Sequence, residues 1–290
     1  MANLQKRLPE NVPGDFFVDS TCIDCDTCRQ LAPEVFAEGS SHAYVHRQPE
    51  TAAARREALR ALVSCPTGSI GSQGDDKPAA VMDDFPLLIE GPVYYCGFNS
   101  PKSYGGNSYF VRDERGNWLV DSPKFLPRLV KRLEALGGVA HIFLTHQDDV
   151  ADAHLYARHF GANRYIHEAE LSAQPDAEVV LRGWAPQELA PGFVVLPSPG
   201  HTAGHCLLLV GGRFLFTGDH LDFDRERKRL SASPNYCWHS WPQQITSMEQ
   251  LLAQRFEWVL PGHGQRVELP WPEMERQLRE LVVRMRSGRG

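Results

Sequence analysis

Four of the seven cysteines in this 290-residue chain have a spacing that suits a metal cluster. Cys22, Cys25 and Cys28 follow one another at intervals of three, and Cys65 comes much later, directly before Pro66. Three thiolates in one short loop can hold three corners of a cubane, because soft sulfur donors suit iron. A distant fourth thiolate closes the cage. A zinc site and plain buried thiols are the alternatives, but zinc sites usually show paired C-x2-C knuckles.

The pattern C-x2-C-x2-C followed by C-P resembles a bacterial-type ferredoxin with a single [4Fe–4S] cluster. The resemblance covers roughly residues 8–75 and includes "APEVF" and "CPTGSI". It implies that Cys22, Cys25, Cys28 and Cys65 bind the cluster, and no second triplet is present for a second one. The other cysteines have no ligand spacing and are expected to be buried small hydrophobic residues: Cys96, Cys206 and Cys237.

A second group of polar residues lies at the ends of predicted strands. Four motifs place His or Asp on loops, often beside glycine, which allows sharp turns and close approach to a ligand. Such donors suit zinc, iron or manganese, so four of them in series predict a metal site. The motifs are "LTHQDDVAD" (144–152), "SPGHTAGH" (198–205), "FTGDH" (216–220) and "LPGHG" (260–264).

These motifs resemble those of the metallo-β-lactamase-fold superfamily, which includes glyoxalase II, lactonases, persulfide dioxygenases and flavodiiron proteins. The resemblance covers roughly residues 88–270. It implies a four-layer αββα sandwich with one or two divalent metal ions, zinc or iron. By this resemblance His201 binds the first metal, Asp219 bridges the two, and His263 binds the second. His205 is expected nearby as a non-ligand.

The first motif departs from the family pattern T-H-x-H-x-D-H, and two alignments are possible. Without a gap, His146 and Asp148 serve the first metal, and Val150 and Ala151 replace two ligands of the second. With a gap, His146 becomes the second histidine, and Asp148 and Asp149 face the second metal. Asp148 and Asp149 are also the candidates to take up a proton during catalysis.

The surrounding elements predict an α+β chain of two domains. Residues 1–75 are assigned to a small ferredoxin-like domain and residues 88–290 to the sandwich with its C-terminal helix. Residues 76–87 are the expected linker, because "GSQGDDKPAAVMDD" is polar and carries Gly and Pro. Short apolar runs alternate with helical patterns after it, and the predicted helices include "LPRLVKRLEALGG", "DDVADAHLYARHFG", "SMEQLLAQRF" and "WPEMERQLRELVVRMR".

Composition narrows the class of function. The net charge of −6 argues against a nucleic-acid partner. No apolar run approaches the ~18 residues of a membrane span, and "MANLQKRLPE" resembles neither a signal nor a transit peptide. We therefore expect a cytoplasmic protein with reduced thiols and a small-molecule substrate. A redox partner protein is a further candidate.

Three functions remain open from the sequence. A metal-dependent hydrolase is the first expectation, since a metal-bound water can act as the nucleophile. A redox enzyme is the alternative, with an iron site that receives electrons from the cluster. A non-catalytic iron–sulfur binding or sensor protein is the third. Tyr236, Trp238 and Trp241 could line a substrate pocket or pack in the core.

Overall fold

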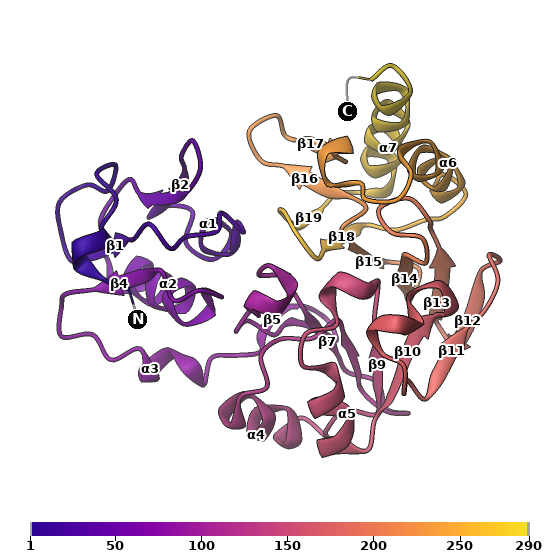
Figure 1. The fold of residues 1–290 in the computed structure, drawn as a ribbon, viewed down its shortest axis with the longest axis horizontal. Helices are drawn as coiled ribbons and strands as arrows, with labels where there is room; N and C mark the ends of the chain where they lie inside the picture. The colour runs from indigo at the N-terminus through magenta and orange to yellow at the C-terminus, as the bar shows by residue number, and fades with distance from the viewer. Residues whose placement is uncertain (1, 289–290) are drawn as a thin grey trace. The chain divides into compact units, whose positions relative to one another are not determined.

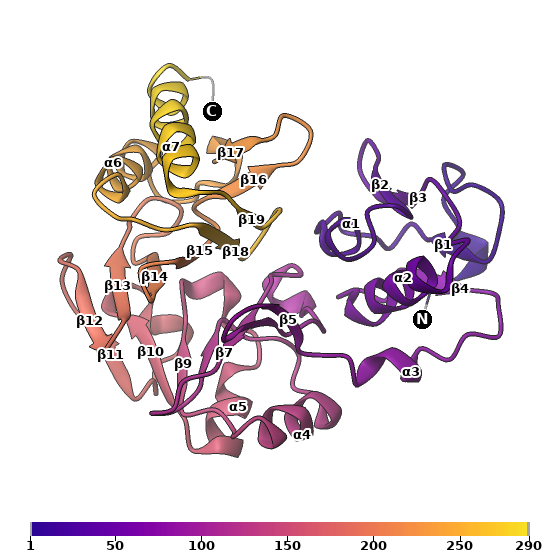
Figure 2. The ribbon, with the colours of Figure 1, turned by 180° about the vertical axis from the view of Figure 1, so that it is seen from behind.

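A computed structural model describes residues 2–288 of the chain. The chain divides into two compact units, Met1–Ala140 and His141–Gly290, and both contain helices and strands (Figures 1 and 2). The mixed helix and strand content predicted from the sequence is confirmed. No helix in residues 2–288 combines the length and the apolar character that a bilayer crossing requires.

The N-terminal part of the first unit has two short antiparallel ladders and two helices. Thr51 caps the longer helix, because its Oγ1 accepts a hydrogen bond from the amide of Ala54 (3.1 Å). That helix ends at Cys65, and Pro66 prevents its continuation. The elements are η1 (Leu4–Lys6), β1 (Phe16–Val18) paired with β4 (Ile70–Ser72), β2 (Phe36–Glu38) paired with β3 (Ala43–Val45), α1 (Thr27–Leu31) and α2 (Ala52–Ser64).

Residues 76–87, the expected linker, contact the N-terminal part of the first unit. They contain the short helix α3 (Ala79–Met82). Asp76 accepts two hydrogen bonds from the Arg55 guanidinium (2.8 and 2.6 Å), and the Phe85 side chain is fully buried. The segment therefore has tertiary contacts of its own, and the domain boundaries stay a prediction.

Four antiparallel strands and one helix complete the first unit. The strands pair in chain order, and large aromatic side chains such as Tyr95, Tyr109 and Trp118 are buried among them. Residues 96–108 form the loop that joins the second and third strands. The elements are β5 (Leu87–Glu90), β6 (Val93–Tyr95), η2 (Pro101–Ser103), β7 (Tyr109–Val111), β8 (Trp118–Val120) and α4 (Pro127–Ala135).

The second unit begins with three parallel strands. Parallel strands need a crossover connection, and α5 (Ala153–Phe160) supplies it between the first two. The helix ends at Gly161, whose left-handed backbone favours glycine. The other elements are β9 (His141–Phe143), η3 (Gln147–Asp149), β10 (Asn163–His167), η4 (Glu168–Ala173) and β11 (Val179–Leu181).

A six-stranded sheet forms the rest of the second unit, in the order β12-β13-β14-β15-β18-β19. Its two central strands β14 and β15 are buried along their whole length, which agrees with their continuous apolar sequence. Helices α6 and α7 lie side by side and pack on this sheet. The elements are β12 (Gln187–Ala190), β13 (Phe193–Pro197), β14 (Cys206–Val210), β15 (Phe214–Gly218), β16 (Asp222–Asp224), β17 (Arg229–Ser231), η5 (Pro234–Tyr236), α6 (Trp241–Leu251), β18 (Trp258–Pro261), β19 (Val267–Glu268) and α7 (Trp271–Arg286).

The helix expected over "SMEQLLAQRF" begins earlier and ends earlier than predicted. It starts at Trp241, because Ser240 caps it with a hydrogen bond from the Gln243 amide (3.4 Å) and Pro242 suits the first turn. Trp241 packs against the core between the helices and the sheet. It is therefore a core residue and not part of an aromatic loop.

The register of β15 against β18 positions two of the sequence motifs. The two strands run parallel, with Gly218 opposite Pro261. The ends of parallel strands meet at one edge of a sheet, so "FTGDH" and "LPGHG" emerge together. The Gly262 amide donates to the Gly218 carbonyl (2.7 Å) and joins the two loops.

The buried face of α7 provides a test of the core. Leu278 is fully buried, whereas Val283 on the same helix is 66% exposed. We expect Leu278→Ala to lower the free energy of unfolding by about 2–5 kcal/mol through lost burial and a cavity. Val283→Ala should change it by less than about 0.5 kcal/mol. Urea denaturation followed by circular dichroism measures both, and equal effects would contradict the packing described.

Candidate metal centre

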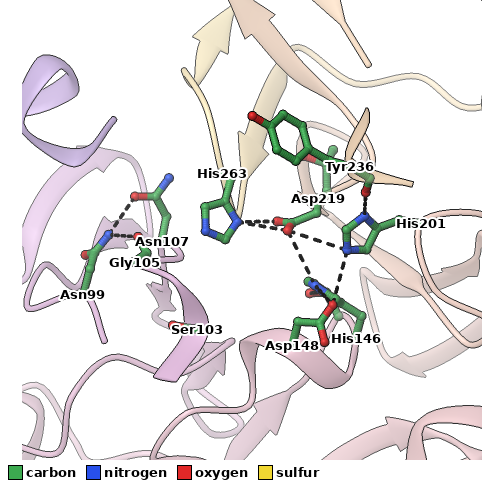
Figure 3. Close-up of polar contacts among 12 residues, drawn as sticks. Asn99, Ser103, Gly105, Asn107, His146, Asp148, His201, Asp219, Tyr236 and His263 are labelled. Carbon is green, nitrogen blue, oxygen red and sulfur yellow. Dashed lines mark hydrogen bonds and ion pairs between the residues drawn. The ribbon is translucent and has the colours of Figure 1, made fainter. Parts of the chain in front are cut away.

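Two histidines and two aspartates converge on one point in the second unit. His146 follows β9, Asp148 lies in η3, His201 precedes β14 and Asp219 follows β15. The Asp148 Oδ2 atom lies 3.9 Å from His146 Nε2 and 3.6 Å from His201 Nε2. The Asp219 Oδ2 atom lies 3.7 Å from each of the same two nitrogens (Figure 3). A backbone hydrogen bond from the Cys206 amide to the Thr145 carbonyl (2.8 Å) joins the first two motifs.

The hydrogen bonds of the two imidazoles aim their Nε2 lone pairs at this point. The Tyr236 carbonyl lies 2.5 Å from His201 Nδ1 and can only accept, so Nδ1 carries the proton and Nε2 does not (Figure 3). His146 Nδ1 contacts the Thr145 hydroxyl at 2.9 Å. Both Nε2 atoms are buried without a hydrogen-bond partner. A buried polar atom without a partner is costly, and a cation at this point would satisfy both.

The donor separations fit a single transition-metal ion. A tetrahedral ion with bonds of about 2.0–2.2 Å separates its donors by about 3.3–3.6 Å. The four histidine–aspartate separations of 3.6–3.9 Å are slightly longer than this range, and the donors that are all close to one another form two groups that share His146. Two imidazoles and two carboxylates are a donor set for zinc or iron, so these residues fit the metal that the sequence predicts.

The imidazole of His263 contacts the carboxylate of Asp219. Its Nδ1 lies 2.8 Å from Asp219 Oδ1 and 3.0 Å from Oδ2. Two overlapping groups of donors lie close enough to hold an ion: His146, Asp148 and His201, and His146, Asp149 and Asp219. The structure thus brings five of the six predicted ligands together and places the sixth, His263, behind the carboxylate of Asp219.

Asp149 lies beside Asp219 on the buried side of the site. A Cβ atom at Gly262 would stand 2.6 Å from Asp149 Oδ2 and 2.7 Å from Asp219 Oδ1, so only glycine leaves room for both carboxylates. Val150 and Ala151 offer no donor to a second ion. Asp148 lies with His146 and His201, as the ungapped alignment expects; the ligand roles themselves stay predictions.

Burial and neighbouring charges set the protonation of the donors. Burial lowers the pKa of His146 to about 4, so this imidazole is neutral at physiological pH and can bind a metal. Burial alone would raise the pKa of Asp219, but His263 outweighs it and holds that pKa below its usual value. The interaction with His201 lowers the pKa of Asp148, a carboxylate that is 45% exposed.

Sequence reasoning missed two residues that support the site, Glu170 and His220, and placed His205 nearby. The Glu170 carboxylate is buried and accepts hydrogen bonds from the amides of Gln147 (3.2 Å) and Gly204. Its carboxylate thus connects the first motif to the second through hydrogen bonds. The sequence around Glu170 gives no indication of this role. The rings of His205 and His220 stack in series behind His146, at 5.1 and 5.0 Å between centroids. His220 was within a recognised motif but received no role.

The aromatic segment 233–242 divides between surface and core. Tyr236 and Trp238 are 65% and 63% exposed, and the Trp238 ring lies 6.1 Å from that of His201. Cys237, expected to be buried, is half-buried and donates to the Gly200 carbonyl (3.1 Å). The Trp238 ring therefore lies beside one donor of the metal centre and the Tyr236 ring lies beside Trp238, while Cys96 and Cys206 are fully buried as expected.

The four spaced cysteines line a common cavity in the first unit. All four are free thiols. Burial raises the pKa of Cys25 to about 11 and that of Cys28 further above its ordinary value. Bound iron supplies the positive charge that thiolates need there, so these residues fit a cluster whose insertion releases protons.

Comparison with known proteins identifies both parts of the chain. Residues 18–72 match the protein family described as the 4Fe-4S single cluster domain of ferredoxin I. This match confirms the predicted ferredoxin domain and supports a [4Fe–4S] cluster. No curated protein sequence matches the chain.

Solved structures show the fold of the remaining part. VMB-1 aligns with a TM-score of 0.54 and 15% identity, over 70% of this chain and 96% of that one. The DIM-1 metallo-β-lactamase gives 0.52 and 15%, over 69% and 96%. The metallo-β-lactamase family protein TTHA1429 from Thermus thermophilus gives 0.50 and 18%, over 69% and 81%. At this identity the likeness shows the fold alone, and it confirms the predicted metallo-β-lactamase fold.

The donor geometry predicts which substitutions empty the site. His201→Ala, Asp219→Ala and Asp148→Ala should each lower metal affinity at least about tenfold, because each removes a donor from the cage. Asp149→Ala should lower it less, and His154→Ala, on the exposed face of α5, should not change it. Elemental analysis measures the total metal, and the content of acid-labile sulfide gives the share of iron that belongs to the cluster. Loss of metal in Asp149→Ala with full retention in Asp148→Ala would contradict the arrangement.

The buried histidines predict that acid lowers the folding stability of the protein when no metal is bound at the site of His146 and His201. Burial lowers the pKa of His220 to about 3, well below the value of ~6.5 in an unfolded chain. The unfolded state therefore binds the proton first, and stability falls as pH drops from about 6.5, by up to ~1.4 kcal/mol per unit.

Urea denaturation between pH values of about 7.5 and 5 measures this slope. The His220→Asn variant should show a smaller slope of stability against pH, and His154→Asn should show the wild-type slope. All three proteins carry the same cluster, so any contribution of the cluster to the slope is the same in each. Equal slopes in the wild type and both variants would show that His220 is not a buried neutral group.

Proposed function

We propose that this chain, a single-cluster ferredoxin domain joined to a metallo-β-lactamase fold, is an oxidoreductase with one iron ion in its metal centre. The observation that carries the proposal is the donor set of His146, Asp148, His201 and Asp219 around one point. Two histidines with carboxylate and open positions are typical of non-haem Fe(II) sites.

The charge of the donors supports redox chemistry over hydrolysis. Two carboxylates neutralise a divalent ion, and a neutralised ion acidifies a bound water less than one held by neutral imidazoles alone. Anionic oxygen donors also stabilise a higher oxidation state. Iron bound there would supply one-electron chemistry at an open coordination position, and the [4Fe–4S] cluster would supply the electrons.

The residues around the metal position have separate tasks in this proposal. Tyr236 fixes the ring of His201 through its backbone carbonyl. His263 fixes the Asp219 carboxylate at 2.8 Å. Asp149, buried beside Asp219, is the group to hold or release a proton next to the substrate.

The exposed aromatic pair indicates the kind of substrate. Tyr236 and Trp238 lie 6.4 Å apart between ring centroids, and Trp238 faces the ring of His201. Such walls suit a small planar or apolar molecule. A reduced carrier protein would reload the cluster, and a reducing compartment such as the cytoplasm would keep its thiols available.

A zinc-dependent hydrolase is the second candidate. The same four donors could hold zinc. The position of Asp149 favours this candidate, because a buried carboxylate beside the metal position can take a proton from an attacking water.

Iron loading and cluster-dependent reduction test the redox proposal. Protein purified without oxygen should contain iron in the second site and give the electron paramagnetic resonance signal of a nitric oxide adduct. The His201→Ala variant should lose that adduct and keep its cluster. In ferric protein, limited dithionite should reduce the second site quickly in the wild type and slowly in a cluster-free Cys65→Ser variant.

Zinc as the only second-site metal would overturn the redox proposal and leave the hydrolase. Equal reduction rates with and without the cluster would also contradict it, because the cluster would then carry no electrons to the site.

A further inference from the structure

A buried asparagine in the loop between β6 and β7 lies close to one cluster ligand within the first unit. Asn99 is fully buried, and its Nδ2 atom lies 3.0 Å from the Oγ1 atom of Thr27. Thr27 Oγ1 in turn lies 3.4 Å from the Sγ atom of Cys25. A residue from outside the 18–72 ferredoxin region thus contacts a cluster ligand through a single hydroxyl.

The partners of Asn99 fix which way its amide points. The Gly105 carbonyl lies 2.6 Å from Nδ2 and can only accept, so this atom is the amide nitrogen (Figure 3). The Oδ1 atom on the other side accepts from the Tyr95 hydroxyl (2.7 Å). The two protons on Nδ2 have three acceptors within reach, Thr27 Oγ1, the Gly105 carbonyl and Asn107 Oδ1 (3.2 Å), so Asn99 can donate to Thr27 and cannot accept from it.

This polarity directs the proton of Thr27. A threonine hydroxyl has one proton and two lone pairs. Because Asn99 occupies a lone pair of Oγ1, the proton is free to point at Cys25 Sγ, which accepts when it is a cluster-bound thiolate. The result is a relay of two hydrogen bonds, from Asn99 to Thr27 and from Thr27 to Cys25.

The same loop also touches Cys25 through its backbone. A Cβ atom at Gly105 would stand 2.7 Å from the Cβ and 2.9 Å from the Sγ of Cys25, and Gly105 has a φ of +88°. Only glycine permits this approach. Lys124 adds a hydrogen bond from its Nζ atom to the Pro66 carbonyl (2.9 Å), next to the fourth cluster ligand.

Two of the other ligand sulfurs accept hydrogen bonds from amides within the ferredoxin region. Cys22 Sγ accepts from the amide of Asp24 (3.4 Å), and Cys65 Sγ accepts from that of Ser69 (3.3 Å). Cys25 also has a hydrogen bond with the Thr27 backbone, so the Thr27 hydroxyl is the part of its hydrogen bonding that the β6–β7 loop directs.

We propose that Asn99 is a positioning residue that fixes the Thr27 proton on Cys25 and so raises the reduction potential of the cluster. Reduction adds one electron to the cluster, with no bond made or broken. A hydrogen bond donated to a ligand sulfur stabilises the added negative charge and favours the reduced state. The proposal depends on the cluster and not on the chemistry of the second metal site.

A redox titration of the full-length protein tests this. The electron paramagnetic resonance signal of the reduced cluster is followed against potential with dye mediators under argon. Thr27→Val and Asn99→Ala should each lower the equilibrium constant for reduction about two- to tenfold, or ~20–60 mV at ~59 mV per tenfold. The double variant should show no larger shift, because both changes break the same relay.

Two variants distinguish the loss of the directed Thr27 proton from a general loosening of the structure around the cluster. Thr27→Ser keeps the hydroxyl and should restore the wild-type potential. Tyr95→Phe removes the hydrogen bond that Asn99 Oδ1 accepts and should shift the constant less than twofold. If Asn99→Ala does not hold its cluster, Thr27→Val, which keeps the shape of the side chain, decides alone.

Unchanged potentials in Thr27→Val with an intact cluster would overturn the proposal. So would additive shifts in the double variant, or a shift in Tyr95→Phe equal to that in Asn99→Ala. Repeating the titration in a His201→Ala background keeps this result separate from any failure of the proposed oxidoreductase function.

Discussion

Two buried imidazole lone pairs that point at the same place are the constraint on which the metal centre depends. His146 and His201 are almost completely buried, and their Nε2 atoms have no hydrogen-bond partner. Burial keeps His146 neutral because it lowers the pKa of that imidazole, so repulsion between two imidazolium ions does not arise. Only a cation can satisfy both nitrogens and the facing carboxylates together. The parallel pairing of β15 with β18 and the hydrogen bond between their loops hold Asp219 in place for it.

The donor set gives the centre its expected character. A site with two carboxylates and two imidazoles neutralises a divalent ion, which makes a bound water less acidic than it would be on an ion held by imidazoles alone. Val150 and Ala151 offer no donor and Asp219 contacts His263, so the donors that lie close to one another form two overlapping groups that share His146. In the proposed function, the ferredoxin domain would supply electrons to an ion bound there. The cluster is not isolated at the end of a free linker, because Asn99 and Gly105 contact its ligand environment.

Residues in sequence motifs could be predicted, whereas their supports could not. The cysteine spacing and the loops "PGHTAGH", "FTGD" and "LPGHG" carry local signals, because glycine turns and donor types appear in the sequence itself. Glu170 and Asn99 act over long sequence distances, on Gly204 and Thr27, and only the fold brings them there. The helix expected over "SMEQLLAQRF" starts at Trp241 in the structure, because the sequence pattern does not reveal the cap at Ser240. The two alignments of the first motif both stay predictions, because Asp148 lies with His146 and His201 while Asp149 lies with His146 and Asp219.

Metal counting on full-length protein purified without oxygen is the most direct test of this account. Iron, zinc and acid-labile sulfide would be measured on the same sample, together with a His201→Ala variant. The account predicts about four sulfides and about five metal ions, four in the cluster and one in the cage, with the variant losing only the last. Two ions beyond the cluster in the wild type, or an unchanged count in the variant, would contradict a single metal centre built on His146 and His201.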